Sequence, residues 1–356
     1  MRIGINTQML ATNYGGILQN FALQKVLKNL GHEVVTFDIG KYSWFEWIID
    51  SSKVLVKKIL GRKSTFNKSP IYRKKIESPL RRFVYKNISL TTPRTKFLHR
   101  GLISKYAIDT IIVGSDQVWR PCYNKRIEDM FLAFAQDDKV RKIAYAASFG
   151  TDFWEFTPFQ TKKCSSLAMN FHAISVREKT GVELCDKYLG VKATHVLDPT
   201  LLLSVEDYTT LCTSIPKRAP FVFAYILDKS DAIETKIRAF ATSQGLDCVI
   251  LSAGREIDHN DSIEKWLSNF RDAKYVITDS FHGTVFSIIF NKDFSVIGNS
   301  QRGNSRFSSL LDLLGLQDQF LLEFSCIPCS VNWKHVSAVL DVAKQESLSW
   351  LISSLE

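Results

Sequence analysis

The sequence lacks the features of several large protein classes. It has no run of the ~20 apolar residues that a transmembrane helix needs, and no apolar segment follows a basic N-terminus. We therefore expect no membrane span, no secretion signal and a cytoplasmic location. The 7 cysteines are scattered and odd in number, which suits free thiols better than disulfides. The one CxxC pair, Cys326 and Cys329, has no histidine cluster nearby, so we expect no metal site.

Two common nucleotide-binding motifs are also missing. Neither GxGxxG nor GxxxxGK[ST] follows the first expected strand, residues 2–6, although Asp38 lies near the end of the second strand. We therefore expect no nicotinamide cofactor. Asn13, Tyr14 and Gly15 instead precede a helix expected over residues 18–30. This loop lies where a Rossmann-type fold binds phosphate or substrate. A glycine turn without a ligand is the alternative.

The patterns that are present indicate an α/β protein. The chain has 356 residues, of which 45% are hydrophobic, and apolar β-type runs alternate with stretches of helical spacing. This length suggests two domains. We place the first at residues 1–198, with a last expected strand at residues 194–198 and its boundary at Pro199, the second at residues 199–335, and a C-terminal helix at residues 336–356. Within the second domain we expect a helix over residues 231–243 and a later helix capped by Asn304.

The sequence KYVITDSFHGTVFSII, from Lys274 to Ile289, organises the second domain. Residues 275–278 suit a buried strand, and residues 284–289 suit a buried helix. The turn between them contains Ser280, Phe281, His282 and Gly283. A helix that begins beyond the carboxyl end of a strand directs N–H groups at an anion, and a histidine there can donate a proton near neutral pH. The alternative is a capped helix with a histidine packed beside it.

Polar residues also follow three expected strands of the first domain. Asp116 and Gln117 come after residues 109–113, Ser148 after residues 142–146, and Arg177 after residues 173–176. If these strands are neighbours, their carboxyl ends meet at one edge of a parallel sheet. Each residue alone also has an ordinary explanation as a turn, cap or ion-pair residue.

Residues 42–100 interrupt the α/β alternation. Residues 53–100 hold fifteen of the 46 basic residues and one of the 36 acidic residues, so the net charge of +10 comes entirely from this segment. An aromatic-rich amphipathic stretch lies at its start. Such a helix can lie in an anionic membrane interface. The alternative is a helical hairpin with a solvated basic face. We do not expect nucleic acid as a partner, because no nucleic-acid-binding motif accompanies the charge.

Seven segments in order resemble the polysaccharide pyruvyl transferase family: NYGGILQNFALQ, IIVGSDQVW, AYAASFG, ISVRE, LDPTLLL, VITDSFHGTVFSIIF and NSRFSSLLDLLGL. The resemblance spans nearly the full length. It implies a GT-B-like fold, in which two Rossmann-like domains face each other across a cleft and the C-terminal helix crosses back. It also implies transfer of an enolpyruvyl unit from phosphoenolpyruvate to a sugar, forming a ketal.

The resemblance implies substrate contacts at His282, Arg177 and Asp116. The chemistry of phosphoenolpyruvate suits His282 as the acid that protonates the methylene carbon and Asp116 as the base for the sugar hydroxyls. Arg177 and the helix expected from residue 284 would hold the anionic groups. Some family members have arginine where this chain has Ser280, so we expect the phosphate contact to come from Arg306 or Arg302.

The expected function is pyruvyl transfer to two hydroxyls of a sugar, with galactose the leading candidate, during surface polysaccharide biosynthesis. Phosphoenolpyruvate is the donor substrate, no cofactor is expected, and a lipid-linked oligosaccharide is one candidate acceptor at the inner face of the cell membrane. Two alternatives remain: a glycosyltransferase that uses a nucleotide sugar, and a non-catalytic nucleic-acid-binding protein acting through residues 53–100.

Overall fold

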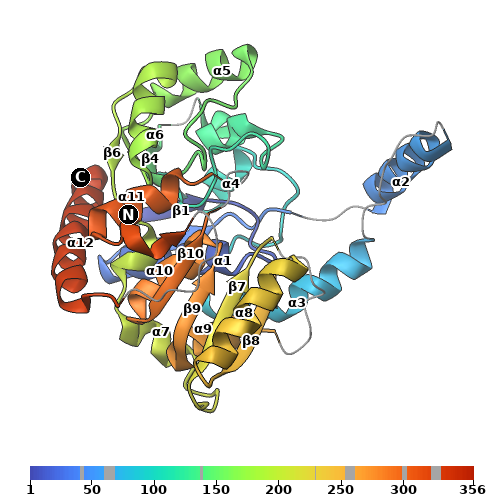
Figure 1. The fold of residues 1–356 in the computed structure, drawn as a ribbon. Helices are drawn as coiled ribbons and strands as arrows, with labels where there is room; N and C mark the ends of the chain where they lie inside the picture. The colour runs from blue at the N-terminus through green and yellow to red at the C-terminus, as the bar shows by residue number, and fades with distance from the viewer. Residues whose placement is uncertain are drawn as a thin grey trace.

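The protein consists of two parallel β-sheets flanked by helices (Figure 1). The computed structural model describes residues 1–40, 44–59, 69–136, 139–228, 230–252, 261–298, 303–321 and 330–356. The first sheet has the strand order β2-β1-β3-β4-β5-β6, and the second has the order β11-β10-β9-β7-β8. Every paired strand runs parallel to its neighbour within these residues. The expected α/β fold with two Rossmann-like domains is confirmed.

The strands are short and their central residues are apolar, as sheets buried on both faces require. The first sheet contains β1 (Arg2–Asn6), β2 (Glu33–Thr36), β3 (Thr110–Val113), β4 (Arg141–Ala147), β5 (Ala173–Val176) and β6 (Thr194–His195). The second contains β7 (Phe221–Ile226), β8 (Asp247–Ser252), β9 (Ala273–Thr278), β10 (Asp293–Ile297) and β11 (Phe320–Leu321).

Helices connect the strands and cover both sheets. Those of the first domain and its insertion are α1 (Tyr14–Asn29), α2 (Trp44–Ile59), α3 (Pro70–Asn87), α4 (Gly101–Lys105), α5 (Pro158–Ala168) and α6 (Lys179–Leu184). After the first sheet come α7 (Val205–Leu211), α8 (Asp231–Ser243), α9 (Ile263–Asp272), α10 (Phe281–Ile289), α11 (Ser305–Leu314) and α12 (Trp333–Leu355). The short helical turns are η1 (Ile127–Phe131), η2 (Ala133–Ala135), η3 (Cys185–Leu189), η4 (Pro199–Leu202) and η6 (Gln317–Gln319).

Three apolar clusters hold these layers together. One lies within the first domain and one within the second. The largest runs from Ile3 of β1 through Phe223 of β7 to Leu355 of α12, so it joins both domains. Burial of apolar surface is the dominant favourable term in folding, and this shared cluster therefore keeps the facing edges of the two sheets together.

The insertion after β2 is helical and is anchored by a buried ion pair. Arg81 of α3 donates two hydrogen bonds to Asp38, at 3.0 and 2.6 Å, and Arg94 pairs with both Asp38 and Glu77. The Asp38 carboxylate is therefore paired inside the protein. It is not available to bind the ribose of a dinucleotide cofactor, as an acidic residue near the end of the second strand does in many Rossmann-type folds. In Figure 1, α2 stands away from the rest of the molecule, whereas α3 leads back to it.

The C-terminal helix α12 reaches the first domain. Ser347 of α12 accepts a hydrogen bond from the backbone of Leu197 at 3.0 Å, and Trp350 packs on Tyr145 of β4 at 6.1 Å between ring centroids. Arg141 of β4 also donates a hydrogen bond to the carbonyl of Glu356. The end of the chain therefore ties the two domains together.

Several expected element boundaries are wrong, and caps explain most of the errors. Helix α1 begins at Tyr14 rather than residue 18, because the Asn13 side chain accepts the Gly16 N–H. Helix α10 begins at Phe281 rather than residue 284, because Ser280 caps it. Asn304 precedes α11, but its side chain makes no cap hydrogen bond there. Arg302 lies outside the described residues.

Other expectations concern membranes, metals and thiols. Within the described ranges, no helix combines the length and apolar character that crossing a membrane requires, and no group of three or more metal-ligating side chains is found. The cysteines that the structure describes are all free. Burial raises the pKa of the Cys164 thiol to about 12. Cys326 and Cys329 lie outside the described part of the chain.

Candidate active site

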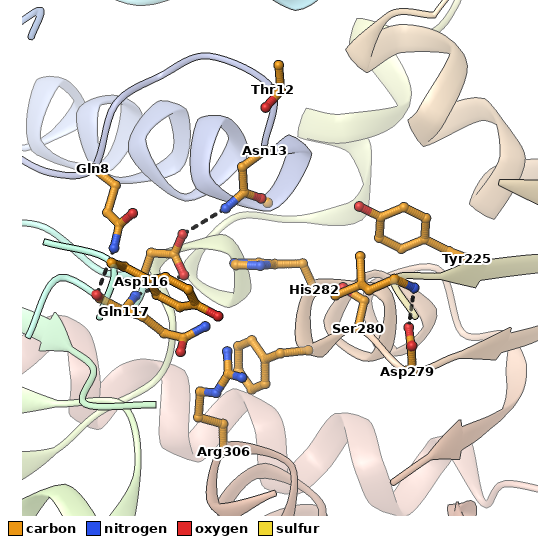
Figure 2. Close-up of a pocket in the computed structure, with 14 residues that line it drawn as sticks. Gln8, Thr12, Asn13, Asp116, Gln117, Tyr225, Asp279, Ser280, His282 and Arg306 are labelled. Carbon is orange, nitrogen blue, oxygen red and sulfur yellow. Dashed lines mark hydrogen bonds between the residues drawn. The ribbon is translucent and has the colours of Figure 1, made fainter. Parts of the chain in front are cut away.

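A pocket of about 330 Å³ opens between the two domains (Figure 2). Its walls come from loops at the carboxyl ends of strands in both sheets, where ligands bind in open α/β folds. The first domain contributes Gln8, Thr12, Asn13, Gly15, Asp116, Gln117 and Tyr123. The second contributes Tyr225, Leu227, Asp279, Ser280, Phe281, His282 and Arg306.

Asp116 and Asn13 form the first-domain side of this pocket. The Asn13 Nδ2 atom donates a hydrogen bond to Oδ2 of Asp116 at 3.0 Å, and Oδ1 of Asp116 accepts the Gln117 N–H at 2.9 Å. Asp116 has a φ of 73°, in the left-handed region that a side chain with a Cβ rarely adopts. The turn after β3 therefore holds this carboxylate toward the pocket at some cost in backbone energy.

His282 lies in the first turn of α10, on the opposite side. The Ser280 hydroxyl accepts the Gly283 N–H and so fixes where the helix starts. Helix geometry leaves the N–H groups of Phe281 and His282 without partners inside α10. The His282 side chain is 8% exposed, and its ring extends toward Asp116 in Figure 2. These N–H groups and the imidazole lie at the same edge of the pocket. The N–H groups suit a bound anion, and the imidazole beside them suits the transfer of a proton to it.

Gly283 and Asp279 hold the turn before α10 in place. A Cβ atom on residue 283 would overlap Thr278 of β9, so glycine permits the close contact between helix and strand. The Asp279 carboxylate accepts the N–H groups of Leu227 and Asp228, at 2.6 and 2.9 Å. The loops that follow β7 and β9 are therefore bound to each other beneath the pocket.

Asp198 and Arg177 form a buried ionic pair behind His282. The Arg177 Nη1 atom donates to Oδ2 of Asp198 at 2.6 Å, and its Nη2 lies 3.7 Å from Oδ1 of Asp116. The Nε2 atom of His282 lies 3.7 Å from the same Asp198 oxygen. Burial opposes ionisation of Asp198, but its contact with His282 and the charge on Arg177 hold its pKa well below the ordinary range. Arg177 thus links the two carboxylates that flank the imidazole.

Arg306, in the first turn of α11, supplies positive charge within the pocket lining. It is buried, and burial together with the nearby charge on Arg177 lowers its pKa to about 10. The Phe281 ring lies near both guanidinium groups, 4.4 Å from that of Arg177 and 5.7 Å from that of Arg306. An aromatic ring attracts cations at such distances.

The structure brings most of the expected site residues to this pocket. Asn13, Gly15, Asp116, Gln117, Ser280, Phe281, His282 and Arg306 all line it. Arg177 does not: its guanidinium is taken up by Asp198, so a direct substrate contact at Arg177 is not what this geometry favours. Ser148 is also elsewhere, because its hydroxyl donates to Glu178 at 3.1 Å.

Tyr14 lies beside a second, smaller pocket. Its ring stacks on Trp266 at 5.4 Å between centroids, with 15° between the ring planes, and meets the edge of Tyr225 at 6.2 Å. Tyr14 and Trp266 both line this pocket of about 200 Å³. Tyr225 lines the main pocket, so these aromatic side chains separate the two.

Sequence reasoning missed Asp198 as a site residue. It interpreted this residue as the end of the last strand before the domain boundary, but β6 ends at His195 and the Asp198 side chain caps η4. The LDPT segment belongs to one of the family-like motifs. The position of Asp198 directly before a proline is the only sequence signal for this residue. The lining residues Gln8, Thr12, Tyr123, Tyr225 and Leu227 had no recognisable pattern.

Comparison with known proteins assigns a family to this arrangement. A model of the polysaccharide pyruvyl transferase family matches residues 13–301, which include both sides of the pocket. The chain belongs to the polysaccharide pyruvyl transferase family. This membership agrees with the expectation from the sequence motifs, and it makes the protein a transferase of polysaccharide biosynthesis. The comparison with curated protein sequences finds no match.

One of the similar solved structures supports the fold of this pyruvyl transferase family member. Arabidopsis thaliana UGT89C1 complexed with UDP-L-rhamnose is similar with a TM-score of 0.51 and 11% identity, over 98% of this chain and 98% of that one. The S. aureus MnaA-UDP co-structure has a TM-score of 0.48 and 10% identity, over 98% of this chain and 89% of that one. At such identities the first similarity shows the GT-B-like fold alone.

Proposed function

We propose that the protein transfers the pyruvyl group of phosphoenolpyruvate to two hydroxyls of one sugar, with galactose as the first candidate acceptor. The product is a pyruvate ketal on a surface polysaccharide or its precursor, and inorganic phosphate is released. Family membership supports pyruvyl transfer. The observation that carries the rest is the position of His282, in the first turn of a helix and facing Asp116 across one interdomain pocket.

Anion binding is the first requirement. Phosphoenolpyruvate carries a phosphate and a carboxylate, and the described pocket contains a cationic side chain, Arg306, and a helix N-terminus at Phe281 and His282. A guanidinium can hold an oxyanion with two hydrogen bonds, and helix N–H groups can hold a second. We assign the phosphate to Arg306 and the carboxylate to the first turn of α10. Arg177, 4.4 Å from the Phe281 ring, adds positive potential nearby.

Proton transfer to carbon is the second requirement. His282 gives a proton to the methylene carbon of the donor, which becomes a methyl group while C2 becomes an oxocarbenium-like centre. The neighbouring carboxylate of Asp198, 3.7 Å from Nε2 of His282, lies where it can orient the imidazole for this step. Because Asp198 has both Arg177 and Thr200 as partners, its own position does not depend on the histidine.

Asp116 serves the acceptor. It accepts the proton of the first sugar hydroxyl as that oxygen attacks C2 and gives a tetrahedral intermediate. The C2–O bond to phosphate then breaks, and the second hydroxyl attacks the same carbon. One of the two hydroxyl protons returns to His282 and replaces the proton that this residue gave to carbon. The other leaves with the phosphate, so the reaction balances without an oxidant. No cofactor takes part in these steps.

The deciding experiment offers the protein two labelled donors. Phosphoenolpyruvate with carbon-13 in the pyruvyl unit and UDP-sugars with a radioactive sugar are each incubated with a galactosyl acceptor. We expect carbon-13 in the acceptor as a ketal and one phosphate released per ketal. Incorporation of the labelled sugar instead would identify a glycosyltransferase, and incorporation of neither label would contradict both functions.

A further inference from the structure

Helix α2 exposes an apolar face that the body of the protein does not cover. Ile48, Leu55, Val56 and Ile59 are 56%, 52%, 55% and 76% exposed. At 100° per residue, positions 48, 55 and 59 fall on one line along the helix, with position 56 beside it. We refer to these four side chains as the α2 apolar face. Contiguous exposed apolar side chains mark interaction sites more often than isolated ones do.

Positive charge accompanies this face. Lys53, Lys57 and Lys58 are exposed on the same helix, and residues 53–100 contain fifteen basic residues and one acidic residue. Two of the fifteen, Arg81 and Arg94, are occupied by Asp38 and Glu77 inside the protein. In the described part of the insertion, α3 adds further exposed basic side chains at Lys74, Lys75, Arg82 and Lys86.

The helix is placed for contact with something larger than a small molecule. In Figure 1, α2 projects beyond the two domains, and α3, the next described helix along the chain, lies nearer to the body. The Arg81–Asp38 pair and the buried residues Leu80 and Phe83 fix the inner end of α3. The inner end of α3 is therefore fixed on the body, and α2 lies where it can reach a surface without displacing either domain.

We propose that α2 docks on the anionic surface of a lipid bilayer, with the α2 apolar face inserted among the acyl chains and the lysines at the headgroups. An amphipathic helix binds such a surface through buried apolar area and attraction of its cations to anionic lipids, and these are the two properties of α2. A second copy of the chain would bring two strongly basic insertions together. A nucleic acid would match the charge but leave the α2 apolar face in water.

Vesicle sedimentation tests the docking without any sugar substrate. The full chain is mixed with phosphatidylcholine vesicles that contain or lack phosphatidylglycerol. We expect pelleting with the anionic vesicles, little with the neutral ones, and a decrease as salt rises, because salt screens the attraction. Pelleting that ignores lipid charge, or no pelleting with anionic vesicles, would overturn the proposal.

Two variants separate the contributions of charge and apolar area. Lys57→Glu/Lys58→Glu should weaken partitioning by at least about tenfold, since each basic residue near the surface contributes measurably to binding. Ile48→Ser/Leu55→Ser/Ile59→Ser should weaken it as well, even at low salt. Their matched controls lie on α5, where Lys162→Glu/Lys163→Glu and Phe159→Ser change exposed residues of the same kinds and should leave partitioning unchanged.

The remaining outcomes point to other occupants and would overturn the proposal. Concentration-dependent dimers in light scattering, lost in the triple serine variant, would make the α2 apolar face an interface between copies. Salt-sensitive binding of an oligonucleotide that is tighter than binding to vesicles would favour nucleic acid. Unfolding curves check that each variant folds. Phosphate release with a soluble acceptor should be equal in all of them, so membrane docking and catalysis can fail independently.

Discussion

Gly15 of the first domain lies directly against the imidazole of His282 in the second. A Cβ atom on residue 15 would overlap Nδ1, Cγ and Cβ of that histidine. Alanine normally stabilises a helix relative to glycine, yet helix α1 has glycine here in its first turn. The absence of a side chain at residue 15 therefore lets the two domains approach until the imidazole faces Asp116.

Gly15→Ala should consequently impair catalysis more than folding. The added methyl group must move His282 or push the domains apart, because the Cβ of the histidine is attached to its backbone and cannot swing away. We expect kcat to fall at least about tenfold, since a displacement of about 1 Å at a reacting group can cost far more than that. Circular dichroism should show an intact fold. An unchanged kcat would mean that the imidazole position in this structure is not the productive one.

His282→Gln should remove proton donation to the methylene carbon. Loss of a positioned general acid typically lowers the rate about 10²–10⁴-fold. We therefore expect the rate of phosphate release from phosphoenolpyruvate with a galactosyl acceptor to fall by that factor or more. The matched control is His335→Gln on α12, an exposed histidine outside the pocket. Turnover that survives in the His282 variant would exclude this residue as the acid.

Asp198→Asn should destabilise the protein, because it leaves the buried guanidinium of Arg177 without its closest carboxylate. Breaking a buried ion pair by neutralising one partner costs about 3–5 kcal/mol. Urea unfolding at pH 7 measures this loss. Glu234→Gln, which breaks the solvent-screened Glu234–Arg238 pair on α8, should have a far smaller effect.

The difference between wild type and Asp198→Asn should also depend on pH. The folded-state pKa of Asp198 lies well below its ordinary value, which is about 3.9 in an unfolded chain. Its contribution to the free energy of unfolding is therefore complete above about pH 4 and disappears as the pH falls below that value. Unfolding at pH 7, 5 and 3.5 should show a constant difference at the first two values and a smaller one at the third. A difference that grows toward low pH would contradict the ionised carboxylate.

Arg306→Gln should raise the KM for phosphoenolpyruvate more than it lowers kcat. The guanidinium lines the pocket but touches no reacting carbon in the proposed mechanism, so its main contribution is to holding the phosphate. Initial rates over a range of donor concentrations separate the two constants. Arg238→Gln, at an exposed arginine of α8, serves as the control. A large fall in kcat with an unchanged KM would instead place Arg306 in the chemical step.

Removal of divalent cations should leave turnover unchanged. The proposed mechanism stabilises negative charge with Arg306 and the first turn of α10 and passes protons through His282 and Asp116. We therefore expect the same kcat before and after dialysis against EDTA, measured by phosphate release in metal-free buffer. Activity that is lost after dialysis and restored by Mg²⁺ would show that a metal ion takes part in the charge stabilisation or proton transfer assigned to these side chains.

The local patterns predicted most elements but not all of their ends. Residues 173–176 and 231–243 were expected as a strand and a helix, and β5 and α8 have these bounds. The starts of α1 and α10 were placed too late because glycine and polar residues lower helical preference, whereas the Asn13 and Ser280 caps outweigh it. For Asp198, the expected strand was too long, since β6 has two residues.

The sequence by itself determined the class of fold, the order of the elements and the segments that carry polar residues at strand ends, because these follow from short-range periodicity and turn residues. Tertiary structure alone decided which of those residues share a pocket. It directed Arg177 to Asp198 and Ser148 to Glu178, and it brought Gly15 against His282 from the other domain. The first two pairings join strand ends and loops within the first domain, and the third joins the two domains. All three depend on how separate elements pack in space, which short-range periodicity does not specify.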